Sequence, residues 1–263
     1  MVAAGQSRQP LLQAEHLVKR YGDLLAVDDL NLTVFPGEVV GLLGPNGAGK
    51  TTSISMCTGL LRPTAGSVII GGVDLRRDPA AAKQLIGYVP DEPYLYDKLS
   101  GREFVTFMAE VYGVRTDVAS RREELLTLFD LQDAADDLIG GYSHGMRQKT
   151  ALAGMLIHEP RLLFLDEPTV GLDPRGARLL KSTLRTLAEE GRSVVLSTHI
   201  LEIAQAICDR VAIIDHGRLL AEGTLAELRD ANGAGGDETL EDIFLRLTGG
   251  EEDRTLAQSL LAP

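Results

Sequence analysis

The sequence predicts an α/β fold with a mostly parallel sheet, an antiparallel β flank and an inserted helical subdomain. Short apolar runs recur along the chain and are nearly continuous, which is typical of strands covered on both faces. Helical patterns lie between these runs, and this alternation favours parallel strands joined by crossover helices. The runs are Val39–Leu43, Val68–Ile70, Leu162–Leu165, Val194–Leu196 and Val211–Ile214.

Two helices have clear sequence signals. One is predicted over Gly49–Gly59, directly after the first apolar run. The other is predicted over Pro174–Glu190, because proline favours the first position of a helix and Gly191 stands just past the end.

Two segments depart from the alternation. Leu11–Val34 has strand-like pieces on either side of a turn at Tyr21–Asp23, which predicts the antiparallel flank. Residues 98–145 show mainly helical patterns, at Gly101–Tyr112 and Ala119–Leu131. We therefore expect a helical insertion there.

We expect one main domain at residues 11–228 and a C-terminal tail at residues 229–263. Asn232–Gly236 reads NGAGG, which predicts a flexible break. Thr239–Leu247 has the pattern of a short amphipathic helix, and the acidic end of the chain is expected to be frayed.

The composition is that of a globular protein, with 44% hydrophobic residues and a net charge of −12. Because nucleic-acid binders need a positive field, this charge argues against a nucleic acid partner. Cys57 and Cys208 lie far apart and form no CxxC pair, so they indicate neither a zinc site nor a redox motif. The apolar runs fall far short of the ~20 residues of a spanning helix. The first ten residues carry no apolar signal segment.

A glycine-rich loop follows the first apolar run and opens the first helix. It fits G-x-x-x-x-G-K-[ST], the phosphate-binding P-loop of nucleotide hydrolases. Glycines let successive N–H groups point at phosphate oxygens, Lys50 reaches the β- and γ-phosphates, and the Thr51 hydroxyl binds Mg²⁺. The expected ATP-binding residues of the loop are Gly44, Pro45, Asn46, Gly47, Ala48, Gly49, Lys50, Thr51 and Thr52.

Two acids end a later apolar run, Leu162–Leu165. Ligands of open α/β sheets bind at the carboxyl ends of the strands, so these two acids stand where ligand-binding or catalytic residues are expected. We expect Asp166 to bind Mg²⁺ and Glu167 to act as the general base that polarises the attacking water. A pair of acids in a surface turn is the alternative, and the P-loop favours the catalytic interpretation.

A third motif narrows the family. Tyr142–Met146 resembles the signature motif Leu-Ser-Gly-Gly-Gln of the ABC (ATP-binding cassette) ATPases. Ser143 lies 23 residues before Asp166, a spacing that the family shares, and a helix is expected over Gly145–His158. The resemblance covers residues from about Leu11 to Leu228. It assigns nucleotide contacts on the opposite subunit to Ser143, His144, Gly145 and Met146.

The same resemblance assigns further residues by their order in the chain. Tyr21 is similar to the aromatic residue that stacks on adenine, and His199 to the switch histidine that contacts the γ-phosphate. Asp173 lies in the segment that is similar to the loop contacting the opposite subunit. His16, His158 and His216 belong to no motif, and we expect ordinary surface or core roles for them.

The resemblance implies a mechanism and partners. Two cassettes, as a homodimer or a pair of different cassettes, would bind ATP and Mg²⁺ head to tail between P-loop and signature. Closure and opening would drive an integral membrane permease subunit through the helical insertion. The chain would then be cytoplasmic and peripheral on the inner face of the cell membrane, without a nucleic acid partner.

Two residues depart from the family pattern. Asp91 stands where the family has a glutamine; aspartate can bind Mg²⁺, but it is one methylene shorter and charged. His144 replaces the first signature glycine, and we expect its side chain to point away from the phosphates.

The sequence allows three function classes to be compared: an exporter cassette, a soluble ABC ATPase and a non-hydrolysing nucleotide sensor. Lys50 and Ser143 are 93 residues apart with no sustained heptads, unlike cassettes of chromosome and repair proteins. Tyr142–Lys149 and the Thr239–Leu247 segment resemble cassettes of bacterial exporters. The alternative is a soluble ABC ATPase that energises a non-transport complex, such as cofactor assembly. A non-hydrolysing sensor is disfavoured because Glu167 and His199 are both present.

Overall fold

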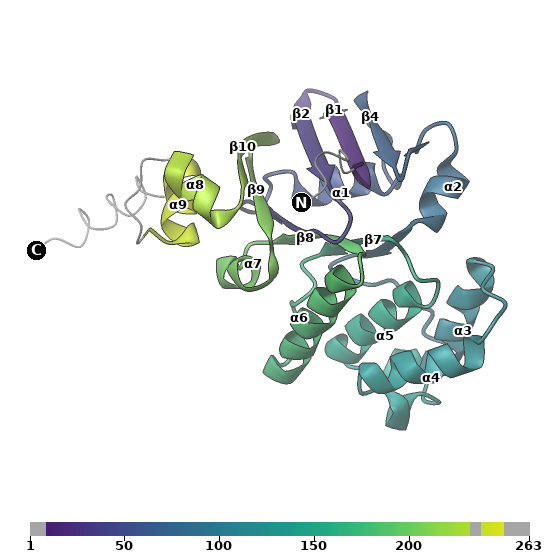
Figure 1. Ribbon diagram of the computed structural model, residues 1–263. Coiled ribbons are helices and arrows are strands. Elements are labelled where there is room, and N and C mark those ends of the chain that lie inside the picture. Colours follow the sequence, from purple (N-terminus) through teal and green to yellow (C-terminus); the bar gives the residue numbers. More distant parts are fainter. Residues whose placement is uncertain (1–8, 232–237, 250–263) are drawn as a thin grey trace, which may run out of the picture.

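The computed structural model describes residues 9–231 and 238–249, so the expected NGAGG break and the acidic end lie outside the described residues. Within the described part of the chain, the strands form two sheets (Figure 1). The main sheet has the strand order β10-β9-β3-β8-β7-β6 and the flanking sheet the order β2-β1-β4-β5.

The main sheet is parallel except at one edge. Its parallel strands are β3 (Val39–Leu43), β6 (Ile86–Val89), β7 (Leu162–Asp166), β8 (Ser193–Thr198) and β9 (Arg210–Asp215). The edge strand β10 (Arg218–Gly223) pairs antiparallel with β9. The predicted parallel sheet is confirmed, whereas the β9–β10 hairpin was not predicted.

The flanking sheet confirms the predicted antiparallel flank. Strands β1 (Leu12–Tyr21) and β2 (Leu24–Val34) form a hairpin around the predicted turn. Strands β4 (Ala65–Ile70) and β5 (Val73–Asp74) complete this sheet. The assignment of Val68–Ile70 to a strand covered on both faces is therefore wrong. Val68 and Ile70 are buried and Ile69 is only partly buried, which is the alternation of a strand with one covered face.

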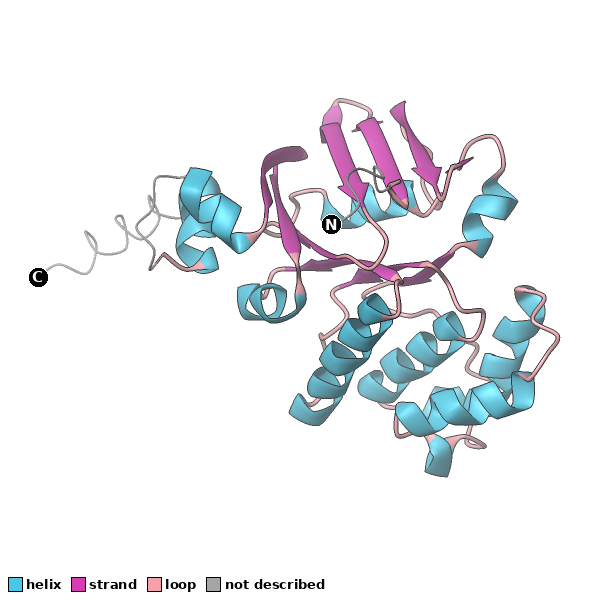
Figure 2. Cartoon of the chain, viewed as in Figure 1, coloured by secondary structure: helices cyan, strands magenta, loops and turns pink. Residues whose placement is uncertain are grey.

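Helices cover both faces of the main sheet (Figure 2). Helix α1 (Lys50–Cys57) lies between the two sheets, with α2 (Pro79–Gln84) at their edge (Figure 1). The opposite face carries α5 (His144–Leu156), α6 (Pro174–Glu189) and α7 (Leu201–Ile207). The predicted helices over 49–59 and 174–190 are confirmed within two residues.

The helical insertion is confirmed as well. It consists of α3 (Gly101–Val111), α4 (Val118–Leu128) and two 3₁₀ turns, η1 (Gln132–Ala134) and η2 (Ile139–Gly141), and it packs on α5. Ser100 caps α3 with a full capping box, since its side chain accepts from Glu103 N while the Glu103 side chain accepts from Ser100 N.

The two faces of the main sheet bury separate cores, which explains the continuous apolar runs. In β7, Leu163 and Leu165 pack among the helices α3–α6, whereas Leu162 and Phe164 pack toward α1 and the flanking sheet. Alternate side chains of β7 therefore fill both cores, and the positions from Leu162 to Leu165 are all apolar.

The C-terminal segment packs on the same domain. Helix α8 (Leu225–Ala231) crosses the boundary expected between residues 228 and 229. Helix α9 (Leu240–Leu247) buries Leu240 and Ile243 against a third core that includes Leu43. Thr239 caps α9 through a capping box with Asp242. Across residues 9–231 and 238–249, the structure contains no helix with the length and apolarity needed to cross a membrane.

We predict that Ile243→Ala lowers the free energy of unfolding by about 2–5 kcal/mol, because it leaves a cavity at a fully buried position. Chemical denaturation followed by circular dichroism measures this. The matched control is Glu241→Ala on the exposed face of α9, expected to change stability by less than about 1 kcal/mol. Equal effects of the two substitutions would mean that α9 is not docked.

Candidate functional site

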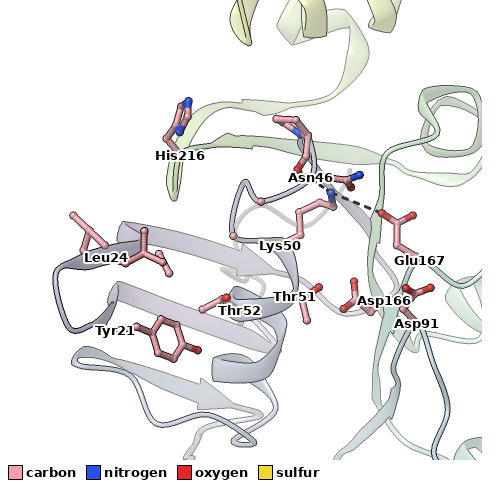
Figure 3. A pocket seen from close by; sticks show the side chains of 15 residues that line it. Tyr21, Leu24, Asn46, Lys50, Thr51, Thr52, Asp91, Asp166, Glu167 and His216 are labelled. Carbon is pink, nitrogen blue, oxygen red and sulfur yellow. Dashed lines mark hydrogen bonds and ion pairs between the residues drawn. The ribbon is translucent and has the colours of Figure 1, made fainter.

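A pocket of about 460 Å³ opens at the carboxyl end of the parallel strands (Figure 3). The P-loop and the first turn of α1 form its floor. Asp91, Asp166 and Glu167 line one end, and Tyr21 and Leu24 line the other. The structure thus brings together the predicted P-loop, the predicted acids and the predicted aromatic residue.

The P-loop follows β3 along a path that requires glycine. Gly49 adopts a φ of 103°, and a Cβ there would lie 2.7 Å from Ala26 O. A Cβ on Gly44 would overlap the backbone oxygen of Ile214. These close approaches hold the loop between β2 and β9, so its N–H groups can face the pocket.

Lys50 is buried under the loop and holds it closed. Its Nζ donates to Gly44 O at 2.7 Å and to Pro45 O at 3.2 Å. The same ammonium lies 3.8 Å from Glu167 Oε1. A buried cation with carbonyl and carboxylate partners can exchange them for phosphate oxygens.

Asp166 and Glu167 are anchored to β8. Ser197 Oγ donates a short hydrogen bond to Asp166 Oδ1, and Glu167 N lies 3.1 Å from Ser197 Oγ. Glu167 has a φ of 47°, an uncommon conformation for a residue with a side chain. This backbone turns the Glu167 carboxylate toward the P-loop instead of along the strand.

His199 and the Glu167 carboxylate meet directly. His199 Nδ1 lies 3.0 Å from Glu167 Oε1, and half of the histidine side chain is exposed. Glu167 Oε2 is buried without a hydrogen-bond partner in the described protein. A buried, unpartnered carboxylate oxygen costs free energy, so it is ready to accept a proton or a water hydrogen bond.

Asp91 lies at the acidic end of the pocket. Burial raises the pKa of its carboxyl, and the charges of Asp166 and Glu167 raise it further. The charge of His144 opposes this by lowering the pKa of Asp91. The carboxylates of Asp91, Asp166 and Glu167 therefore repel one another, and a cation bound among them would reduce this repulsion.

The residues at this end fit Mg²⁺. Thr51, Asp91 and Asp166 all line the pocket, and their oxygens are the ligands that Mg²⁺ prefers. Over the described ranges, no group of three His, Cys, Asp or Glu residues forms a cage by itself. At phosphate sites, Mg²⁺ is generally held by one or two protein ligands together with water and phosphate oxygens.

The aromatic end is open. Tyr21 is 48% exposed and lines the pocket together with Leu24 and Leu25. Lys19 Nζ lies 5.0 Å from the centre of the Tyr21 ring. Leu24, Leu25, Ala26 and His216 also line this pocket and were not predicted as site residues. The apolar positions could have been found from their place directly after the Tyr21 turn, whereas His216 follows a strand far along the chain.

The predicted signature residues do not line the pocket of their own chain. Ser143 caps α5, with its Oγ accepting from Met146 N at 3.3 Å, and His144 and Gly145 form the first turn. Asp173 caps α6, with Oδ1 accepting from Gly176 N at 2.9 Å. The structure thus separates these residues from the P-loop and places them at two neighbouring helix starts.

His144 packs against Gly171 in the loop that follows Glu167. Gly171 has a φ of 77°, and a Cβ there would overlap His144 Cδ2. The imidazole therefore occupies the space that a side chain at position 171 would need.

A family model described as ABC transporter matches residues 27–170, more than half of the chain. The chain belongs to the ABC transporter family. As a member of this family it is an ATP-binding subunit and an ATPase whose hydrolysis is coupled to transport. ABC ATP-binding subunits generally pair with membrane permease components.

Similar proteins support this ABC assignment over most of the chain. Linearmycin resistance ATP-binding protein LnrL of Bacillus subtilis (strain 168) is 39% identical over 232 residues, covering 88% of this chain and 74% of LnrL. Daunorubicin resistance ATP-binding protein DrrA3 of Streptomyces coeruleorubidus is 43% identical over 233 residues, covering 88% of this chain and 72% of DrrA3. A solved ATP-binding subunit of an ABC transporter has a TM-score of 0.84 at 33% identity, covering 90% of this chain and 99% of that one.

We predict that Asp91→Gln keeps ATP binding and changes the hydrolysis rate by less than about tenfold, because glutamine retains an oxygen ligand and removes a crowded charge. Phosphate release at saturating ATP and Mg²⁺, with binding measured in parallel, checks this. Complete loss of turnover would assign Asp91 a role other than metal contact.

We predict that Gly171→Ala lowers hydrolysis at least about tenfold, since its Cβ must displace His144 beside the loop carrying Glu167. Adding His144→Gly to the same chain is expected to recover most of the loss. If the double variant is as impaired as Gly171→Ala alone, the positive φ, and not the histidine contact, limits this position.

Proposed function

We propose that the chain is the ATP-hydrolysing motor of an ABC exporter, and that its pocket holds the triphosphate with Lys50 and the attacking water with Glu167. The main support for this proposal is the set of contacts that the two carboxylate oxygens of Glu167 make. One oxygen meets Lys50 and His199, and the other is buried without a partner among the described residues.

Lys50 and Glu167 have separate roles in the hydrolysis of ATP. Lys50 exchanges the carbonyls of Gly44 and Pro45 for oxygens of the β- and γ-phosphates. The water oxygen bonds to the γ-phosphorus as the bond between that phosphorus and the β,γ-bridging oxygen breaks. Glu167 accepts the proton that the water releases, and ADP is the leaving group.

His199 and Ser197 hold this arrangement in place. His199 lies outside the pocket lining but contacts Glu167 Oε1, and in this proposal it keeps that carboxylate aimed and reaches the γ-phosphate. Ser197 fixes Asp166, which with Thr51 and Asp91 would hold Mg²⁺. When bound, Mg²⁺ neutralises phosphate charge and orients the phosphate oxygens.

The second half of each site comes from another cassette in this proposal. Ser143, His144, Gly145 and Met146 start α5 outside the pocket of their own chain. The N-terminus of this 13-residue helix presents N–H groups and a positive dipole, which suit the phosphates of an ATP bound by a partner. Asp173 caps the adjacent helix and would lie at the same interface. The pair is a homodimer or a combination with a related cassette.

The similar proteins support the proposed partner and location. LnrL and DrrA3 are named for resistance to linearmycin and daunorubicin, which supports export. The motor would bind an integral membrane permease subunit from the cytoplasmic side, and no nucleic acid. Residues 11–228 would act as the ATPase domain with the C-terminal helices docked on it.

We predict that Glu167→Gln lowers hydrolysis by at least about 10²–10⁴-fold, because the amide cannot accept the proton, while ATP binding is kept. With ATP and Mg²⁺, this variant is expected to accumulate as a closed dimer, measured by size-exclusion chromatography with light scattering. A monomer at saturating ATP would contradict the shared site.

A tagged Glu167→Gln protein also identifies the partner. Captured with ATP from detergent-solubilised native membranes, it is expected to retain a protein with several membrane spans. Retention of a soluble scaffold instead would move the function to a non-transport complex and leave the ATPase assignment in place.

A further inference from the structure

The β9–β10 hairpin reaches the nucleotide pocket through a two-residue turn. His216 and Gly217 form this turn, with φ angles of 46° and 77°. Two successive positive φ angles are the mark of a type I′ turn, whose first position favours asparagine, aspartate or glycine. His216 is not one of these favoured residues, and it places an imidazole at the tip of the hairpin.

The turn is fixed to the phosphate loop and to the flanking sheet. Gly217 N donates to Ala48 O at 2.9 Å, and Asp28 N donates to Gly217 O at 2.8 Å. A Cβ on Gly217 would lie 2.7 Å from Ala26 O, so the turn fits closely against β2. Arg218 Nη2 adds an ion pair to Asp28 at 2.6 Å. The position of His216 relative to the P-loop is therefore set by backbone contacts.

The imidazole of His216 lines the pocket and is almost free. Its side chain is 95% exposed, and its nearest ion-pair partner is Asp215, at 3.6 Å between Nε2 and Oδ2. Figure 3 shows His216 at the end of the pocket that carries Tyr21 and Leu24, away from Glu167 and the other acids. It thus lies on the side of the pocket away from the acids.

The residues that line this end of the pocket indicate which part of a bound nucleotide would contact His216. The phosphates belong at Lys50 and Thr51, and an adenine ring belongs on the Tyr21 ring. Leu24, Leu25 and Ala26 supply only apolar side chains there. The ribose lies between base and phosphates, and its hydroxyl groups both donate and accept hydrogen bonds, as the two nitrogens of an imidazole do.

We propose that His216 binds the ribose hydroxyls of the bound nucleotide and makes this site selective for ribonucleotides. This proposal rests on the proposed function, since it requires nucleotide in this pocket. It adds a residue from the β9–β10 hairpin to a site otherwise built from the P-loop, the acids and Tyr21.

The test uses His216→Asn in the full-length chain, because asparagine tolerates positive φ and carries no imidazole. Isothermal titration measures binding of ADP and of 2′,3′-dideoxy-ADP, neither of which is hydrolysed. The wild type is expected to bind ADP about three- to tenfold more tightly than the dideoxy form, the range for one net hydrogen bond. His216→Asn should lose that preference, with weaker ADP binding and unchanged dideoxy-ADP binding. His216→Gly, which also fits a type I′ turn, should behave in the same way.

The matched control is His16→Asn. His16 is another exposed histidine with a positive φ, 51°, and an aspartate partner, Asp29 at 2.7 Å, but it lies outside the pocket. This variant should bind both nucleotides as the wild type does.

Equal weakening of both nucleotides by His216→Asn, or no weakening of either, overturns the ribose contact. A wild-type chain that binds ADP with an inert His216 overturns this inference alone. A wild-type chain that binds no ADP overturns the proposed function as well.

Discussion

The parallel register of three neighbouring strands is the constraint on which the site depends. Leu43 at the end of β3 pairs with Thr198 of β8, and Asp166 at the end of β7 pairs with Ser197. The P-loop, the acidic pair and His199 all follow these strand ends, so they meet at one edge of the sheet. A shift of one residue in the β7–β8 pairing would move Asp166 off Ser197 and turn its side chain to the other face, and a shift in the β3–β8 pairing would move the P-loop relative to both acids.

Charge at this edge is balanced only in part without a ligand. Lys50 is buried next to Glu167, yet burial and then the negative charges of Asp166 and Glu167 raise the pKa of Asp91. A triphosphate alone would increase this negative charge, whereas a triphosphate with a divalent cation would add both partners that the site lacks. In the proposed function, the site would therefore bind the metal complex of the nucleotide in preference to the free nucleotide.

Much of this arrangement could be predicted from sequence because its signals are local. The P-loop spacing, the acids after an apolar run and the helix starts at Ser143 and Asp173 each depend on neighbours in the chain. Strand ends in a parallel sheet converge, so the motifs could also be placed together. The packing of His144 on Gly171 and the placement of His216 beside the P-loop could not be predicted. Both result from contacts between segments that no local pattern connects. Val68–Ile70 was misassigned because a run of three apolar residues does not show which faces will be covered.

The docking of α9 limits how this chain can be divided. The helix packs in the same core as Leu43, the last residue of the strand that precedes the P-loop, and as Ala204 of α7, five residues after His199. A chain shortened to residue 228 would therefore expose an apolar surface directly behind the nucleotide site, and such surfaces favour aggregation. Fusions and truncations intended to preserve the ATPase should keep residues through 249.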